Sequence, residues 1–123
     1  MNAGIIPGQM NDVALGRKIL DTVNMIITLE GGPVPLKEVR VVTAPMFFDS
    51  TYGTSLLGDD GQVVMRVAVQ RPPEAVADTV LHETAHVLLG IEHIDRPDHG
   101  PMFQGTYQRL RDKYFDVVLE SLA

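Results

Sequence analysis

Hydrophobic residues recur at helical spacing in three separate stretches of the chain. In residues 11–29 the apolar side chains lie three, four and seven positions apart, which predicts an amphipathic helix. Residues 31–33, with the sequence GGP, should end this helix because glycine and proline do not continue it. A second helix is predicted over residues 72–89, and a third from near Gly100 to the C-terminus.

Apolar and polar positions alternate between the first two helices, and this shorter period predicts strands. The clearest is QVVMRVAVQ at 62–70, followed by EVRVVT at 38–43 and the weaker TYGTSLL at 51–57. The GDDG at 58–61 is typical of a turn, so a hairpin is expected there. We therefore expect an α+β fold: an N-terminal helix, a small, mostly antiparallel sheet of about three strands, a second helix, a loop and a C-terminal helix.

The composition indicates a folded domain without disulfide bonds. The 123 residues suit a single domain, 1–123, in which residues 1–10 are expected to be extended or frayed. A hydrophobic content of 45% and a charged content of 21% are ordinary for a protein with a packed core. The absence of cysteine excludes disulfides and thiolate metal ligands.

The charge of the chain argues against two classes of partner. The formal net charge is −6, whereas a nucleic-acid-binding protein normally has a basic stripe and a peripheral membrane protein a polybasic surface. The N-terminus lacks the pattern of a signal peptide, and no apolar run approaches the roughly 18 residues of a membrane span. We expect a soluble, cytoplasmic protein without nucleic-acid or membrane partners, although a phage or virion-associated protein would show the same features.

Residues 82–86, with the sequence HETAH, match the metal-binding pattern H-E-x-x-H. On the predicted helix His82 and His86 lie one turn apart, so both imidazoles can reach one ion at about 2.1 Å. Glu83 projects beside that ion, where it can take a proton from a metal-bound water and pass it to a leaving group. The apolar residues around the motif indicate a buried helix, in which a metal would satisfy polar side chains that are costly to bury alone.

The third ligand of such a site has two candidates. On a continuous helix His93 would lie about 10 Å beyond His86 along the axis, and it could share the ion only if the chain turned back at Gly90. The segment H-E-x-x-H-x-x-x-G-x-x-H is similar to the metzincin pattern H-E-x-x-H-x-x-G-x-x-H, with the glycine and the last histidine one residue late. His99 opens HGPMF, residues 99–103, in which glycine and proline should start a helix and aim this histidine from a rigid position.

The order H-E-x-x-H, short loop, H-G-P-x-F at a helix start resembles the SprT-like metallopeptidases, a family that includes the Spartan protease. The resemblance covers residues 63–115 in motif order and predicted elements. It implies a minimal zincin-like domain that binds one zinc ion, uses Glu83 as its catalytic residue and cleaves a protein or peptide substrate. The zinc ligands that it implies are His82, His86 and His99. We favour His99 as the third ligand and keep His93 as the alternative.

Polar residues near the motif have simpler interpretations. His93, if it is not a ligand, is interpreted as a solvated loop histidine, with contact to a ligand histidine or to substrate as the alternative. Asp98 is interpreted as a helix cap, although it and Asp95 could also orient a ligand imidazole. Tyr107 and Tyr114 lie on the apolar stripe of the last helix, where core packing is favoured over a catalytic role.

Three functions are compatible with these motifs. A zinc-dependent metallopeptidase is favoured, because the combined motif is more specific than H-E-x-x-H alone. Strand 62–70 would help to align an extended peptide if it lay at the edge of the sheet. The alternatives are a metal-stabilised binding or assembly module without turnover, and a zinc hydrolase with a non-peptide substrate.

Overall fold

The computed structural model describes residues 7–33, 35–42, 52–95 and 98–123, without the side chains of residues 7–12 and 95. Its elements in chain order are α1 (Pro7–Leu29), β1 (Leu36–Val42), β2 (Gly53–Leu57), β3 (Val63–Ala68), α2 (Pro73–Leu88), α3 (Ile91–Asp95) and α4 (Pro101–Ser121). Two helices depart from the prediction by more than a few residues at an end: α3 lies in the expected loop, and α1 begins within the expected frayed start. A proline at the first helical position loses no hydrogen bond, which explains the early start of α1.

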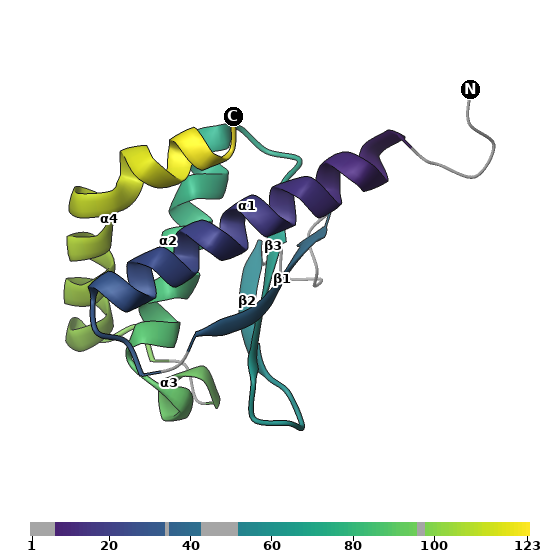
Figure 1. Cartoon of the computed structure of the whole chain (residues 1–123). Coiled ribbons are helices and arrows are strands. Elements are labelled where there is room, and N and C mark those ends of the chain that lie inside the picture. Colours follow the sequence, from purple (N-terminus) through teal and green to yellow (C-terminus); the bar gives the residue numbers. More distant parts are fainter. Residues whose placement is uncertain (1–6, 34, 43–51, 96–97) are drawn as a thin grey trace.

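The three strands form one sheet in the order β1-β3-β2 (Figure 1). β2 and β3 are antiparallel, with Gly53 opposite Val67 and Leu57 opposite Val63, which confirms the predicted hairpin. β1 pairs with β3 in parallel. The α+β class is thus confirmed, but the expectation of a mostly antiparallel sheet is wrong, since one of the two pairings is parallel.

β3 occupies the centre of the sheet because it is the most apolar of the three strands. Val63, Met65 and Val67 are completely buried, whereas β2 contains no buried position. A central strand is paired at both edges, so the most apolar segment gains most from that place. Alternation of residue types predicts a strand and its inner face, but it does not specify the neighbour or its direction, which is why the parallel pairing was missed.

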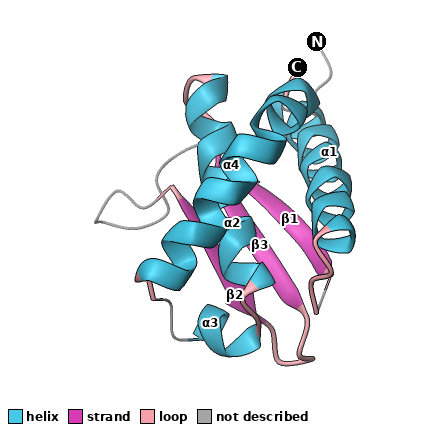
Figure 2. Ribbon diagram, turned by 90° about the vertical axis from the view of Figure 1, so that its left-hand side faces the viewer, coloured by secondary structure: helices cyan, strands magenta, loops and turns pink. Residues whose placement is uncertain are grey.

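The long helices lie on one side of the sheet (Figure 2). α1 packs along β1, α2 packs on β2 and β3, and α4 lies over α2. The fully buried core residues of these helices include Ile19, Val23, Ile26, Val80, Leu81 and Leu110. Burial of each such side chain contributes about 1.5–3 kcal/mol, which fixes α2 firmly against the sheet. None of the helices in the described ranges combines the length and the apolarity that a membrane crossing requires.

The carboxylate of Glu30 joins the end of α1 to α4. It accepts hydrogen bonds from Arg109 Nε at 3.1 Å, Lys113 Nζ at 2.9 Å and Tyr114 Oη at 2.7 Å. The Glu30 side chain is 7% exposed, whereas Arg109 and Lys113 are 56% and 58% exposed. The hydrogen bonds from Lys113 and Tyr114 lower the pKa of Glu30 to about 2.

Glu30→Gln is expected to destabilise the protein at neutral pH and to do so less as the pH falls. Because its folded-state pKa is about 2 and its ordinary value is 4.5, the stabilisation is complete above pH 4.5 and disappears between these values. With two exposed partners, we expect a loss of about 1 kcal/mol in the free energy of unfolding at neutral pH. Urea denaturation at a series of pH values measures it, with Glu120→Gln, exposed on α4, as the neutral control. A difference that persists unchanged toward pH 2 would contradict this role for Glu30.

Candidate metal centre

The histidines and the glutamate expected at the site line one cleft between β2 and α2. The cleft has a volume of about 510 Å³. Its walls are residues 53–56 of β2, Ile94 of α3, and His82, Glu83, His86 and His99. The H-E-x-x-H motif therefore faces the strand across a space large enough for several side chains of a ligand.

Helix α2 places His82 and His86 one turn apart on the same face, because four positions make about one turn. Pro73 opens the helix and Glu74 lies at its positive N-terminal end, so both favour its start. Five of its apolar residues are completely buried: Ala77, Val80, Leu81, Ala85 and Val87. The ring centroids of His82 and His86 are consequently held 5.1 Å apart on the face that borders the cleft.

His99 reaches this pair from the segment that precedes α4. Oδ1 of Asp98 accepts a hydrogen bond from the backbone N–H of Gly100 at 2.8 Å, which closes a tight turn there. Gly100 itself occupies the cap position of α4 and no side chain caps that helix, so the interpretation of Asp98 as the cap is wrong. Asp98 stabilises the turn that carries His99 instead. The side chain of Asp95 lies outside the described residues.

Phe103, in the first turn of α4, forms a common support for the imidazoles. It is 1% exposed. Its ring centroid lies 4.8 Å from that of His82, 4.3 Å from that of His86 and 4.9 Å from that of His99. The aromatic residue of H-G-P-x-F therefore anchors α4 in the core and restricts all three rings at once.

One ring nitrogen from each of His82, His86 and His99 lies within 4.8 Å of the other two. The Nε2 atoms of His86 and His99 are 3.1 Å apart. Tetrahedral zinc with Zn–N bonds of about 2.1 Å requires nitrogens about 3.4 Å apart, so small side-chain adjustments would fit these donors to one ion. The three histidines named from the sequence are thus close enough to bind a metal, and the identity of that metal stays a prediction.

His93 contacts His86 on the side that faces away from the other two histidines of the triad, which consists of His82, His86 and His99. The side chain of His93, in α3, is half-buried. Its Nδ1 lies 2.9 Å from Nδ1 of His86, whereas the other ring nitrogen of His86, Nε2, lies near His99. The convergent donors among the described residues do not include it, so the geometry favours His99 as the third ligand. The interpretation of His93 as a solvated loop residue is wrong, because its side chain is half-buried and contacts His86. That His86 binds a metal stays a prediction.

Glu83 lies beside the triad with only 5% of its surface exposed. Its Oε1 accepts a hydrogen bond from Ser55 Oγ at 2.9 Å, and its Oε2 lies 3.2 Å from Nδ1 of His82. With the proton on that nitrogen, His82 keeps a lone pair on Nε2 for a metal. Ser55 is a site residue that sequence reasoning missed, because nothing in the sequence shows that β2 lies over α2.

Burial lowers the pKa of His86 to about 4, from an ordinary value of 6.5. The negative charge of Glu83 opposes this shift, and the neighbouring imidazoles add to it. His86 is therefore neutral at neutral pH. A neutral imidazole is the form that binds a metal ion.

Gly53 allows β2 to approach α2 closely enough for Ser55 to reach Glu83. A Cβ at Gly53 would lie 2.5 Å from Cγ2 of Thr79 and 3.2 Å from Cγ of Glu83. The first of these distances is too short for any real contact, so an added methyl group must displace the strand, the helix or both side chains.

Gly53→Ala is expected to lower the free energy of unfolding by about 1–3 kcal/mol, the usual cost of overpacking. The matched control is Gly105→Ala in α4, where a Cβ meets nothing within 4 Å. That control should raise stability by up to about 1 kcal/mol, because alanine favours helix more than glycine does. Urea denaturation of both variants gives the comparison, and equal stability of Gly53→Ala and wild type would refute the close approach.

The two tyrosines of α4 pack outside the cleft. Tyr107 donates a hydrogen bond to the carboxylate of Asp78, and burial together with this carboxylate raises its pKa to about 12. Tyr114 is 5% exposed and donates to Glu30. Neither residue lines the cleft, and both contact the core, as the apolar stripe predicted.

β2 is the edge strand that borders the cleft. β3 lies at the centre of the sheet, so strand 62–70 does not meet the condition, an edge position, under which it would align a peptide. β2 pairs with β3 on one side, and four of its residues line the cleft. Any extended ligand in the cleft would therefore meet β2 first.

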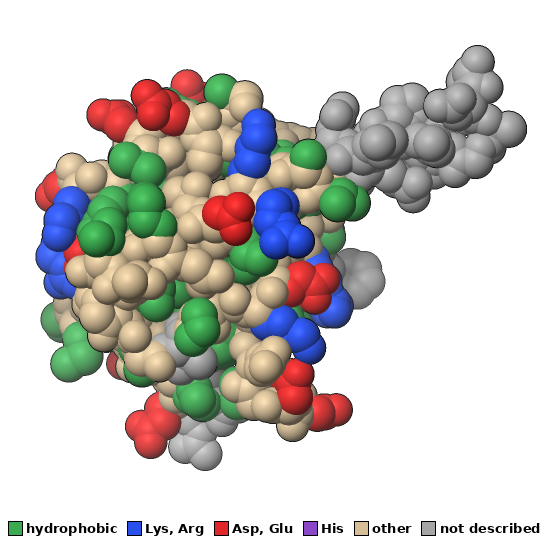
Figure 3. All heavy atoms as spheres, in the orientation of Figure 1, with side chains coloured by type: hydrophobic (Ala, Val, Ile, Leu, Met, Phe, Trp, Pro, Cys, Tyr) green, Lys and Arg blue, Asp and Glu red, His purple; other side chains and the backbone are tan. Residues whose placement is uncertain are grey.

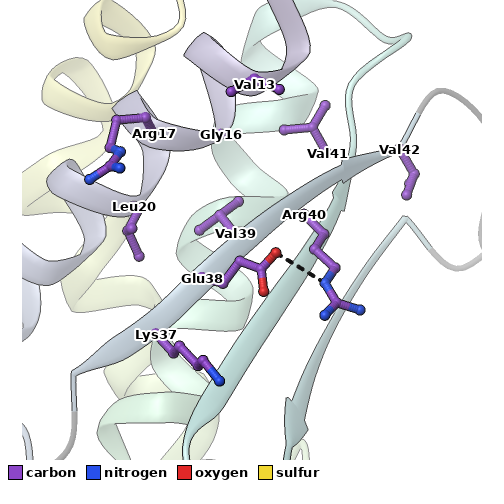
Figure 4. Close-up of a pocket in the computed structure, with 10 residues that line it drawn as sticks. All are labelled: Val13, Gly16, Arg17, Leu20, Lys37, Glu38, Val39, Arg40, Val41 and Val42. Atoms are coloured by element: carbon purple, nitrogen blue, oxygen red, sulfur yellow. Dashed lines mark hydrogen bonds and ion pairs between the residues drawn. The ribbon is translucent and has the colours of Figure 1, made fainter. Parts of the chain in front are cut away.

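A second hollow lies at the opposite edge of the sheet, between α1 and β1 (Figure 4). It is larger, about 660 Å³, and Arg17, Lys37, Glu38 and Arg40 surround it. None of its lining residues is a histidine, and Glu38 accepts a hydrogen bond from Arg40 Nε at 3.2 Å. Basic and acidic side chains are mixed over this face, and no histidine is visible there (Figure 3). Among the described residues, the three potential metal ligands that converge lie in the other cleft.

No protein-family model, curated protein or solved structure matches this chain. The cleft between β2 and α2 is therefore the feature of the chain that indicates a function. Its chemistry consists of three convergent imidazoles, one buried carboxylate, the hydroxyl that holds that carboxylate, and a strand on the facing wall.

Proposed function

We propose that this chain is a zinc-dependent metallopeptidase of the SprT-like type, with a zincin-like fold. The observation that supports it most is the convergence of His82, His86 and His99 within 4.8 Å, beside the buried Glu83. Zinc suits this donor set, because it favours imidazole nitrogen and leaves a fourth position open when three protein ligands bind it. The absence of cysteine is consistent with a catalytic rather than a purely structural zinc site.

Each residue of the site has a defined task in this proposal. A zinc ion bound there would polarise a peptide carbonyl and lower the pKa of water to about 7. Glu83 accepts the proton of the attacking water and then delivers it to the amine that leaves. Ser55 keeps the carboxylate directed into the cleft through its hydrogen bond to Oε1. Burial keeps His86 neutral and ready to bind the ion.

The substrate that fits this cleft is an extended peptide segment. β2 borders the cleft along four residues, and it pairs with only one strand among those described. A peptide laid alongside β2 would gain backbone hydrogen bonds that do not depend on its sequence. Leu56 and Ile94 add apolar contacts for its side chains.

A second candidate function is a metal-stabilised binding module without turnover. The observation that favours it is that both carboxylate oxygens of Glu83 already have partners, Ser55 and His82. A carboxylate held in this way can serve to brace a metal site instead of transferring protons. Such a module would bind zinc and peptide but release the peptide uncut.

Peptide cleavage by the zinc-loaded protein tests the proposed function. We expect mass spectrometry to show new termini in an unfolded protein substrate, no cleavage after addition of a zinc chelator, and recovery when zinc is restored. Fully zinc-loaded protein that binds but never cuts such a substrate would favour the binding module.

A further inference from the structure

We propose that His93 is a positioning residue of the metal centre, which accepts a hydrogen bond from Nδ1–H of His86 and so keeps the Nε2 lone pair of His86 directed at the ion. This inference rests on the proposed metal site. It assigns a task to the one histidine that the triad leaves out, which lies on the short helix α3 between α2 and α4.

The two ring nitrogens of His86 face different histidines. Nε2 lies 3.1 Å from Nε2 of His99, inside the triad, and Nδ1 lies 2.9 Å from Nδ1 of His93, outside it. A neutral imidazole carries a single proton, so only one of these nitrogens can donate while the other keeps a lone pair. The position of that proton decides whether His86 can bind the ion through the nitrogen that faces the triad.

A metal at Nε2 requires the proton of His86 to be on Nδ1. His86 is 5% exposed, so an Nδ1–H group there needs a partner within the protein. Nδ1 of His93 is at hydrogen-bonding distance and can accept if its own proton is on Nε2. The hydrogen bond and metal binding then favour the same tautomer of His86, as outer partners of metal-binding histidines generally do.

The chain holds His93 in place through a tight turn after α2. Gly90 has a φ of 106°, in the region that favours glycine, and its carbonyl accepts the N–H of His93 at 3.0 Å. Ile94 is 6% exposed and anchors α3 in the core. The rings of His93 and Phe103 are nearly parallel, 7° apart in angle, with centroids separated by 5.9 Å.

Three substitutions of His93 separate hydrogen bonding from packing. His93→Phe keeps an aromatic ring against Phe103 and removes the acceptor, His93→Ala removes both, and His93→Asn places an amide oxygen where Nδ1 was. Zinc affinity at neutral pH is measured by competition with a chromogenic chelator. We expect His93→Phe and His93→Ala to bind zinc about 10–100-fold more weakly, and His93→Asn to recover most of the loss. Equal affinity of His93→Phe and wild type would overturn the proposal.

The tautomer of His86 provides a second readout that packing alone would not change. Nitrogen-15 NMR of the imidazoles distinguishes a protonated ring nitrogen from one that carries a lone pair or a metal. In zinc-loaded wild type we expect His86 to be protonated on Nδ1 and His93 on Nε2, and metal binding by His86 through Nδ1 would overturn the inference even if a variant failed to fold. Wild-type protein that binds no zinc at all would refute the proposed function itself, which is a distinguishable result.

Discussion

Glu83→Gln is expected to slow peptide hydrolysis by about 10²–10⁴-fold, the usual contribution of a general base. The amide keeps the shape of the side chain and can still accept the hydrogen bond from Ser55, but it cannot take a proton from water. Because the convergent donors are His82, His86 and His99, zinc should remain bound at wild-type stoichiometry. Hydrolysis of a fluorogenic peptide and zinc content are measured on the same preparations.

Glu74→Gln is the matched control, since it makes the same change at an exposed position of the same helix. Its hydrolysis rate and zinc content should equal those of wild type. A Glu83→Gln variant that cleaves as fast as the wild type would remove Glu83 from the mechanism. Loss of zinc from this variant would instead indicate that Glu83 supports the ion.

Removal of zinc is expected to lower the Tm by roughly 10–20 °C. Zinc at about 1,000 times its Kd adds about 4 kcal/mol to the stability of the folded state. In a domain of this size each kcal/mol changes the Tm by about 3–5 °C. Calorimetry with and without a chelator measures the shift, and a Tm that does not respond to zinc would show that no ion binds the folded state.

His99→Ala should abolish most of this zinc-dependent shift. His99 is exposed, so the zinc-free variant should unfold at the wild-type temperature, and only the response to zinc should disappear. The loss of zinc affinity should exceed the 10–100-fold that loss of an outer partner such as His93 causes. A His99→Ala variant that keeps the full shift would return the third-ligand role to His93.

Much of the candidate site could be predicted from residue spacing alone. Four positions on a helix place His82 and His86 on one face whatever the rest of the fold does. The proline after Gly100 predicts the helix start that presents His99, and the aromatic residue at position 103 predicts its anchor. These features are determined by residues that are close together in the sequence, so they do not depend on how the helices and strands pack.

The partners of these residues could not be predicted in the same way. The contact of His93 with His86 depends on a left-handed residue at Gly90 and on a helix of five residues, which is too short to show a period. The hydrogen bond of Ser55 to Glu83 depends on the sheet order, and alternation does not specify which strand lies at the edge. Both contacts are products of tertiary packing.

The central claim, that one zinc ion binds between His82, His86 and His99, is tested most directly by anomalous diffraction from crystals of the zinc-loaded protein. Data collected on both sides of the zinc absorption edge identify the element and locate it in the same experiment. We predict one anomalous peak per chain, bonded to these three imidazoles at about 2.0–2.1 Å and open toward β2. A peak bonded to His93 in place of His99, or no peak in the cleft, would contradict it.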